Sequence, residues 1–292
     1  MQSQQGIRQE ITDRIIQSLK IGVVPWRKPW KTLSGPSSPT NFLTRKRYSG
    51  INIPLLWSAG TTKGYEVDFW ATFNQWKLVG AHPRKGEKAT QIVFWKPVQK
   101  TGIDADGKRV NSSFAILKTF NVFNVQQVEG GGIEQQLSLE PAASFEHEQR
   151  SRFQEVVAAT GAKIRYGGGT ASYSPSADLI SMPDEERFET FPAFADTLLH
   201  ELAHWSEPRL KWSGSYAEGE LRAEMSAAFS TAALGINAPI DQSAAYIAVW
   251  LKVLQDDTRV LFRAASSASK ASDFILSFSR TVEDETPCFQ EA

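Results

Sequence analysis

The net charge of this chain changes sign at a glycine-rich stretch near the middle, and this change limits how the chain can be divided into domains. Residues 1–128 carry 19 Lys and Arg against 7 Asp and Glu, whereas residues 129–292 carry 13 against 25. The stretch 129–141 holds three consecutive glycines, then polar residues and finally Pro141, a composition that favours neither helix nor strand. We therefore predict two domains, residues 1–128 and 142–292, joined by a linker over residues 129–141. The basic N-terminal part suits a polyanion, and the acidic C-terminal part a different partner.

The overall composition excludes several classes of protein. Hydrophobic residues make up 41% of the chain and charged residues 22%, as in soluble globular proteins. No run of about 18 apolar residues predicts a membrane span, and the first residues lack the pattern of a secretory signal. The single cysteine, Cys288, can form no internal disulfide and no cysteine-rich metal site. We expect a cytoplasmic protein with no membrane partner.

The N-terminal part is predicted to be α+β. Apolar residues recur at helical spacing over residues 7–19, and Thr72 is placed to cap a second, short helix. Residues 91–98 and 114–123 are rich in β-forming types. The Asp-Gly signal at 104–107 lies between these two stretches, so they are predicted to form a hairpin.

The C-terminal part is predicted to be mainly helical. Residues 163–183 contain short extended pieces, Glu207-Pro208 is expected to end one helix, and Asp241 is expected to cap another. Helical patterns cover four stretches, the last of them interrupted near residue 256: residues 145–160, 192–205, 216–234 and 241–278.

The second of these helices carries the sequence His200-Glu201-Leu202-Ala203-His204. Histidines four residues apart lie on one face of a helix, one turn apart, where both imidazoles can bind one ion. Glu201 falls at the edge of that face, where it can take a proton from a metal-bound water without binding the metal itself. The pattern predicts a zinc site, with Mn²⁺ or Co²⁺ as substitutes, and Glu201 as the catalytic base.

A zinc peptidase needs a third protein ligand and one position for water. The helix predicted over residues 216–234 carries Glu220 and Glu224 on one face, and its small residues favour close packing against the first helix. We expect Glu224 to be the third ligand and Glu220 to support a histidine or the ion. The two glutamates could also exchange these roles.

The reaction expected at such a site is amide hydrolysis. The ion would lower the pKa of its water and polarise the scissile carbonyl, while Glu201 takes the proton and passes it to the leaving amine. Tyr216 and His147 are candidates for stabilising the oxyanion. The segment 171–182 either pairs with a substrate strand or is an ordinary structural strand. A structural or inactive metal site is the open alternative.

Aromatic and basic residues are interleaved in the N-terminal part, which holds six of the nine tryptophans. Bases stack on exposed rings while Lys and Arg follow the phosphates, so this pattern predicts binding of single-stranded nucleic acid. Trp70, Trp76 and Trp95 lie in apolar surroundings and are expected in the core. Other aromatic residues in basic loops are either stacking platforms or core. The candidate DNA-binding residues are Trp26, Arg27, Lys28, Trp30, Arg45, Lys46, Arg47, Tyr48, Lys85 and Lys88.

Several of these segments resemble a known family. Pro25-Trp26, Arg47-Tyr-Ser-Gly-Ile-Asn52, Trp76 and Lys85-Gly-Glu-Lys88 are similar to the N-terminal domain of plasmid antirestriction proteins of the ArdC family and of TraC-type primases. His200 to Trp205, with Glu220 to Glu224, resembles the zincin-like metallopeptidase domain that follows it. The resemblance adds Asn52 to the DNA-binding candidates. It implies a first domain that binds single-stranded DNA and a role in protecting incoming plasmid DNA from host restriction.

The leading hypothesis is an antirestriction protein that binds single-stranded DNA and carries a zinc-dependent peptidase site. Its protein substrate is unknown, and DNA-bound host proteins or restriction enzymes are candidates. The alternative is a non-catalytic DNA-coating protein whose zincin domain is a structural or interaction module. Phosphodiester chemistry at the metal is disfavoured, because nucleases usually gather Asp-rich magnesium sites.

Overall fold

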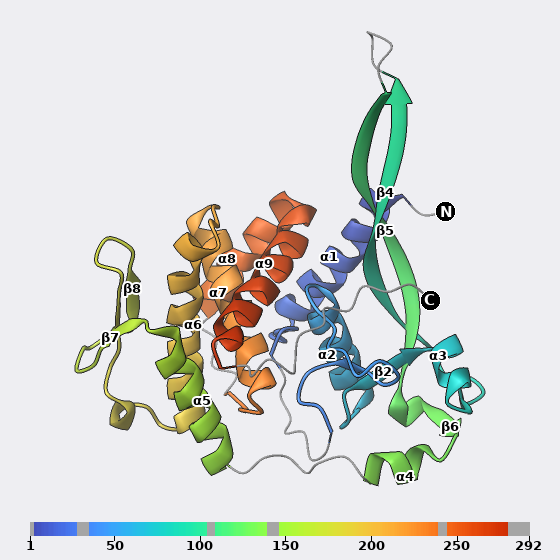
Figure 1. Ribbon diagram of the computed structural model, residues 1–292, viewed down its shortest axis with the longest axis horizontal. Helices are drawn as coiled ribbons and strands as arrows, with labels where there is room; N and C mark the ends of the chain where they lie inside the picture. The colour runs from blue at the N-terminus through green and yellow to red at the C-terminus, as the bar shows by residue number, and fades with distance from the viewer. Residues whose placement is uncertain (1–2, 28–34, 104–108, 139–145, 239–243, 280–292) are drawn as a thin grey trace.

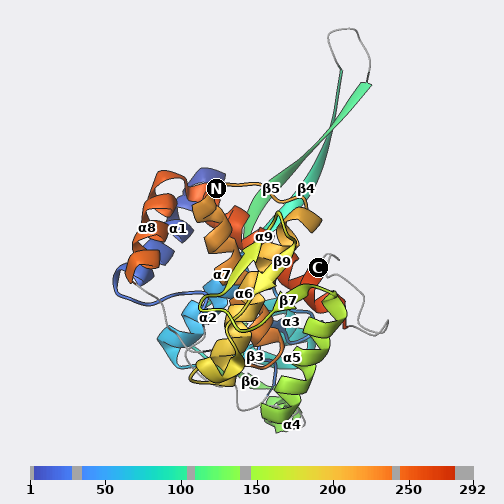
Figure 2. The ribbon, with the colours of Figure 1, turned by 90° about the vertical axis from the view of Figure 1, so that its left-hand side faces the viewer.

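The structure of the chain is a computed structural model that describes residues 3–27, 35–103, 109–138, 146–238 and 244–279 (Figure 1). Helices of the C-terminal part pack side by side, and a long two-stranded ribbon projects from the N-terminal part (Figures 1 and 2). The fold is α+β, as predicted, and the C-terminal part is mainly helical. None of the helices in the described ranges combines the length and apolar character that crossing a membrane requires.

The ribbon consists of β4 (Thr90–Ile103) and β5 (Arg109–Asn124), which pair antiparallel along their whole length. The predicted hairpin is therefore confirmed, and it is longer at both strands than the β-forming runs indicated. The predicted turn at 104–107 lies outside the described residues. At its base the ribbon joins β2 (Phe69–Thr72) and β1 (Thr40–Asn41) in a sheet of order β1-β2-β5-β4.

Two helices of the N-terminal part follow from local signals. α1 (Gln4–Lys20) is capped by Ser3, and α3 (Phe73–Leu78) begins with a capping box at Thr72, as predicted. α2 (Asn52–Lys63) was not predicted, because it contains a proline and a glycine and its first residue is preceded by Ile51, which forms no side-chain cap.

The expectation of a linker without secondary structure over residues 129–141 is wrong for residues 129–130 and 133–138. β6 (Val128–Gly130) pairs with β3 (Ala81–Pro83), and α4 (Ile133–Ser138) follows. The glycines allow two backbone segments to meet, since a Cβ on Gly131 would lie 2.3 Å from the carbonyl oxygen of Val79. Their role is close packing as well as a turn.

The C-terminal part contains the predicted helices, and their bounds agree closely with the patterns. α6 continues through Pro208 to Arg209, so the expected stop at Glu207-Pro208 is wrong. The helix ends at Arg209, with Leu210 as its C-cap, and the next residue, Lys211, has a positive φ of 51°. The predicted cap Asp241 lies outside the described residues. The elements are α5 (Glu146–Thr160), β7 (Lys163–Arg165), β8 (Ser172–Ser174), β9 (Leu179–Ser181), α6 (Phe191–Arg209), α7 (Tyr216–Ala233), α8 (Ala244–Asp256) and α9 (Thr258–Ser277).

One hydrophobic core spans both parts of the chain. The buried stripe of α1 packs against α8 and α9, and Figure 2 shows α1 beside α8. Trp26 is fully buried and meets Trp250 edge to face, with ring centroids 5.3 Å apart. The charge change near residue 129 therefore does not separate two independent cores.

Candidate metal centre

The two histidines of the motif lie one turn apart on α6. Thr190 caps this helix, and the side chains of Leu198, Leu199 and Leu202 are buried on its inner side. This anchoring turns the imidazoles of His200 and His204 towards each other, with their Nε2 atoms 3.2 Å apart. The predicted pairing of the histidines on one helix face is confirmed.

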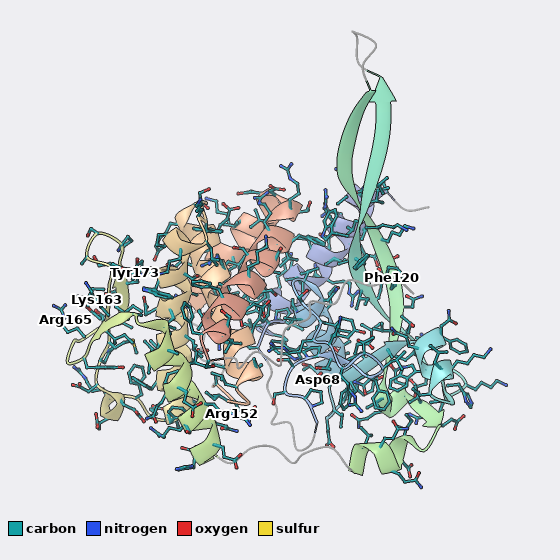
Figure 3. The ribbon with its side chains drawn as sticks, viewed as in Figure 1. Asp68, Phe120, Arg152, Lys163, Arg165 and Tyr173 are labelled. Atoms are coloured by element: carbon teal, nitrogen blue, oxygen red, sulfur yellow. The ribbon has the colours of Figure 1, made fainter. Side chains whose placement is uncertain are left out.

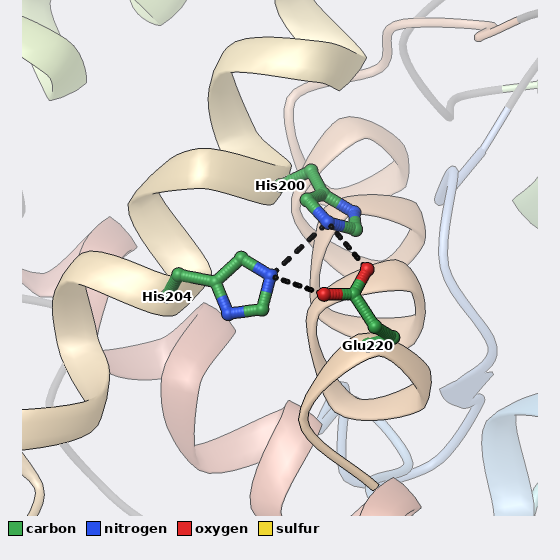
Figure 4. Close-up of side chains that lie close together, drawn as sticks. All are labelled: His200, His204 and Glu220. Carbon is green, nitrogen blue, oxygen red and sulfur yellow. Dashed lines mark hydrogen bonds and ion pairs between the residues drawn. The ribbon is translucent and has the colours of Figure 1, made fainter. Parts of the chain in front are cut away.

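The third group at this point is Glu220 of α7. Its two carboxylate oxygens each lie 3.6 Å from one of the Nε2 atoms of His200 and His204, and Figure 4 shows the three side chains converging. A tetrahedral ion with bonds of about 2.0–2.1 Å sets its ligand atoms about 3.3 Å apart. Two imidazoles and one carboxylate at 3.2–3.6 Å fit a zinc-type ion in both spacing and donor chemistry.

Glu224, the expected third ligand, lies one turn further along α7 and faces elsewhere. Its Oε1 accepts hydrogen bonds from Nε and Nη2 of Arg27, at 2.9 and 2.5 Å. Its Oε2 lies 3.7 Å from Nδ1 of His200, on the side of the ring away from Glu220. The geometry thus exchanges the two expected roles, with Glu220 in the ligand position and Glu224 behind a histidine.

Each histidine has a carboxylate at its Nδ1 atom. Glu224 lies at Nδ1 of His200, and Oε1 of Glu207 lies 3.0 Å from Nδ1 of His204. A carboxylate at Nδ1 favours the tautomer that leaves Nε2 free to bind a metal. Both rings are therefore oriented for the same ion.

Each of these carboxylates is in turn paired with a buried arginine. Arg222, which is 0% exposed, lies 3.6 Å from Glu207 and donates hydrogen bonds to the carbonyl oxygen of Ala203 and to Oγ of Ser206. Arg27 pairs with Glu224 and also donates two bonds to Asp196 of α6, at 2.6 and 2.8 Å. Burial opposes the charge of Arg27, but Asp196 and Glu224 outweigh it and raise its pKa above the ordinary value.

Electrostatics make the centre attractive to a cation. Burial disfavours an imidazolium at His200, yet Glu220 and Glu224 outweigh burial and raise its pKa to about 10. Burial likewise opposes the charge of Glu224, but Arg27 and His200 lower its pKa to about 2. A metal ion at Nε2 of His200 would therefore compete with a proton for this ring.

Glu201 is buried, with 8% of its surface exposed, and burial raises its pKa. The backbone of Tyr173, in β8, opposes this rise and lowers the pKa of Glu201. Tyr173 lies beside α6 in Figure 3. Among the described strands β8 pairs only with β9, so it forms an edge of the small sheet next to the metal centre.

The two candidates for stabilising an oxyanion differ in position. Tyr216 opens α7, is 79% exposed, and its hydroxyl forms a hydrogen bond with Glu220. His147 is exposed on α5. The structure therefore places Tyr216 at the centre.

Several predicted DNA-binding residues are structural instead. Trp26 is 0% exposed and Arg27 is buried in its ion pairs, so neither can contact DNA as placed. The amide of Asn52 donates to the carbonyl oxygen of Val93 and accepts from its N–H, which joins α2 to β4. Tyr48 is half-buried against the cluster around Trp70. Lys28 and Trp30 lie outside the described residues.

The remaining basic candidates are accessible. Arg45 and Arg47 are exposed, Lys46 is half-buried, and Lys85 and Lys88 are exposed. The guanidinium of Arg45 stacks over the rings of Phe42 and Phe69. Of the tryptophans expected in the core, Trp70 and Trp76 are fully buried, as predicted, whereas Trp95 is 37% exposed.

One face of the ribbon carries aromatic and basic residues that are not among the predicted DNA-binding residues. Phe94 and Phe120 are partly exposed, and their rings meet at 6.1 Å between centroids. Lys118 is the cross-strand partner of Phe94, and Lys96 is two residues further along the same face. Figure 3 shows Phe120 on the ribbon. The alternation of aromatic and basic residues in the two β-forming runs was the available signal.

Comparison with known proteins agrees with this architecture. Residues 5–123 match the N-terminal domain of anti-restriction factor ArdC, and residues 151–267 match a zincin-like metallopeptidase family. Two DNA primases TraC of Escherichia coli are 35% and 32% identical over 95% of this chain, which spans 28% and 20% of their lengths. The uncharacterized protein y4eC of Sinorhizobium fredii is 32% identical, over 94% of this chain and 92% of that protein.

Solved structures of the antirestriction ArdC protein from the R388 plasmid have the same fold. The metal-free structure matches with a TM-score of 0.75 at 34% identity, over 93% of this chain and 97% of that one. The Mn(II)-bound structure matches with a TM-score of 0.74 at 34% identity, over 94% and 99%. Because the likeness extends over nearly the whole of both chains, this chain belongs to the ArdC family of antirestriction proteins and contains its zincin-like metallopeptidase domain.

Proposed function

We propose that this chain is a metal-dependent peptidase that binds single-stranded DNA and protects incoming plasmid DNA from host restriction. The observation that carries the peptidase assignment is the set of Nε2 and carboxylate atoms of His200, His204 and Glu220 at 3.2–3.6 Å, with the buried Glu201 on the same helix. Membership of the antirestriction family supports the biological role.

His200, His204 and Glu220 would hold a zinc ion, or Mn²⁺ or Co²⁺ in its place. When bound, the ion supplies Lewis acidity and activates water for attack on a peptide carbonyl. Glu224 and Glu207 keep Nε2 of each imidazole directed at the ion. The binding of Mn(II) by the R388 relative supports a divalent ion at this centre.

Glu201 is the proposed general base. Burial raises its pKa, which brings it nearer to the value that proton transfer at neutral pH favours. The backbone of Tyr173 would support the charged form of this carboxylate, and the hydroxyl of Tyr216, which lowers the pKa of Glu220, would stabilise negative charge on the substrate oxygen. The edge of β8 offers backbone groups with which an extended peptide could pair.

Single-stranded DNA binding is proposed for the N-terminal part. The exposed basic side chains of Arg45, Arg47, Lys85 and Lys88 would follow the phosphates. The ring pair on the ribbon, Phe94 with Phe120, would stack bases between Lys96 and Lys118. DNA-bound host proteins, including restriction enzymes, are the proposed protein substrates, because DNA bound to this part would bring them close to the metal centre.

The test compares wild type with Glu201→Gln and with Glu189→Gln, a control at an exposed glutamate just before α6. Cleavage of a denatured protein is followed with Zn(II) or Mn(II), and DNA protection is followed by transfer into a restricting host. Glu201→Gln should retain its metal and lose about a hundredfold to ten-thousandfold in cleavage rate, because the base is removed. Protection should fall with it, and the control should match wild type.

If cleavage and protection both survive Glu201→Gln, the peptidase assignment is wrong. If wild type cleaves nothing and Glu201→Gln still protects DNA, the non-catalytic DNA-coating function is correct instead.

A further inference from the structure

The metal centre draws one of its supports from the other end of the chain. Arg27 comes shortly after α1, and its partner Glu224 lies 197 residues later. The side chains of Arg27 and Glu224 are 6% and 14% exposed, so this contact is sealed from water. Such a contact is stronger than a surface ion pair and depends on its geometry.

Arg27 determines the position of both carboxylate oxygens of Glu224. Two donors of the guanidinium bind Oε1, while Asp196 fixes the remaining side of the guanidinium through two further bonds. With Oε1 held in this way, Oε2 is directed at Nδ1 of His200, 3.7 Å away. Arg27 touches no ligand atom itself, so any effect it has on the ion passes through Glu224.

We propose that Arg27 is a positioning residue of the metal centre, which makes the centre a joint construction of the N-terminal and C-terminal parts. By holding Glu224 against Nδ1, Arg27 keeps His200 in the orientation and tautomer that presents Nε2 to the ion. The C-terminal part alone contains all three ligands but lacks this support. The inference rests on the proposed metal site.

The test measures Mn(II) and Zn(II) affinity of the full chain against a competing chelator. Arg27→Gln and Glu224→Gln should each weaken binding by about ten- to hundredfold, because loss of a histidine's partner typically has that effect. The double variant should be no weaker than Glu224→Gln alone, since Arg27 acts through that carboxylate. Arg27→Lys should lie between wild type and Arg27→Gln, because one ammonium cannot satisfy both carboxylates.

Arg150→Gln is the matched control. It removes an arginine whose partners are Glu146, Glu185 and the ring of Phe191, none of them a proposed ligand or Glu224, so metal affinity should stay within about threefold of wild type. If Arg27→Gln does not fold, Arg27→Lys is compared in the wild-type and Glu224→Gln backgrounds, with weaker binding expected only in the first.

Arg27 variants that fold and bind metal like wild type would overturn the inference, as would losses that add in the double variant. His200→Ala in the same assay separates this failure from that of the metal site itself. If His200→Ala also binds like wild type, the proposed centre is wrong; if only the Arg27 variants do, the centre stands and the positioning role fails.

Discussion

The two histidines of the centre are supported in the same chemical way but by parts of the chain that differ in origin. Nδ1 of His204 contacts Glu207, which pairs with the buried Arg222, and these residues lie on α6 and α7. Nδ1 of His200 faces Glu224, which pairs with Arg27 of the N-terminal part. The first support forms whenever the two helices pack. The second support forms only when the N-terminal part is folded against the C-terminal part, so an intact centre requires both parts.

The largest effect is expected from removing one support altogether. A chain that starts at residue 142 lacks Arg27 and also α1, whose buried apolar stripe packs against α8 and α9. It should fail to fold stably, since the shared core is left open to water. Circular dichroism and thermal unfolding of the fragment check this. A fragment that melts cooperatively and binds Mn(II) like the full chain would show that the support from the N-terminal part is not required.

The next largest effect, a loss of metal affinity, is expected from replacing the proposed ligands themselves. Glu220→Gln, His200→Ala and His204→Ala should each lower metal affinity by about a hundredfold or more, because one of three ligands is lost. Glu224→Gln should lower it less, as expected for a partner of a ligand. Elemental analysis after dialysis, with Glu201→Gln as a variant that retains metal, ranks these changes. A larger loss in Glu224→Gln than in Glu220→Gln would restore Glu224 as the ligand.

A third comparison sets Arg27→Gln against Arg222→Gln in stability. Removing Arg27 leaves Asp196 and Glu224 without their buried partner, a change that typically costs about 3–5 kcal/mol. Removing Arg222 leaves only the more exposed Glu207 and three neutral acceptors without their partner, a change that typically costs about 1–3 kcal/mol. Urea unfolding with a chelator present measures both. Equal losses would mean that the two supports differ in origin but not in strength.

The smallest effects concern the ribbon, which contacts neither support. Phe120→Ala should weaken single-stranded DNA binding by about 1–3 kcal/mol if the ring stacks a base, with the salt dependence unchanged. Lys118→Gln should instead flatten the salt dependence by a little under one unit. Metal affinity should not change in either variant. Fluorescence anisotropy over a series of salt concentrations distinguishes them, and unaltered DNA binding in both would place the surface elsewhere.

Residues whose environment is local were predicted well. Thr72 was recognised as a helix cap because its capping partner lies three residues away, and the apolar stripe of α1 follows from its own spacing. Trp26 and Arg27 were misjudged because their neighbours in sequence are basic and polar, whereas Trp250 and Asp196, which bury them, lie far along the chain. The composition around Gly131 predicts a linker, because composition does not show which backbone segment approaches these glycines.

The chemistry carried on α6 follows from the sequence alone. The spacing of His200, Glu201 and His204 places two candidate ligands and a candidate base on this helix wherever it packs. The sequence leaves Glu220 and Glu224 equivalent as the third candidate ligand, whereas in the structure Glu220 lies beside Nε2 of both histidines. The two glutamates share a face of α7 and are four residues apart, about 6 Å of rise. The choice therefore depends on where α6 crosses α7, which the combined core of both parts sets and no local pattern encodes.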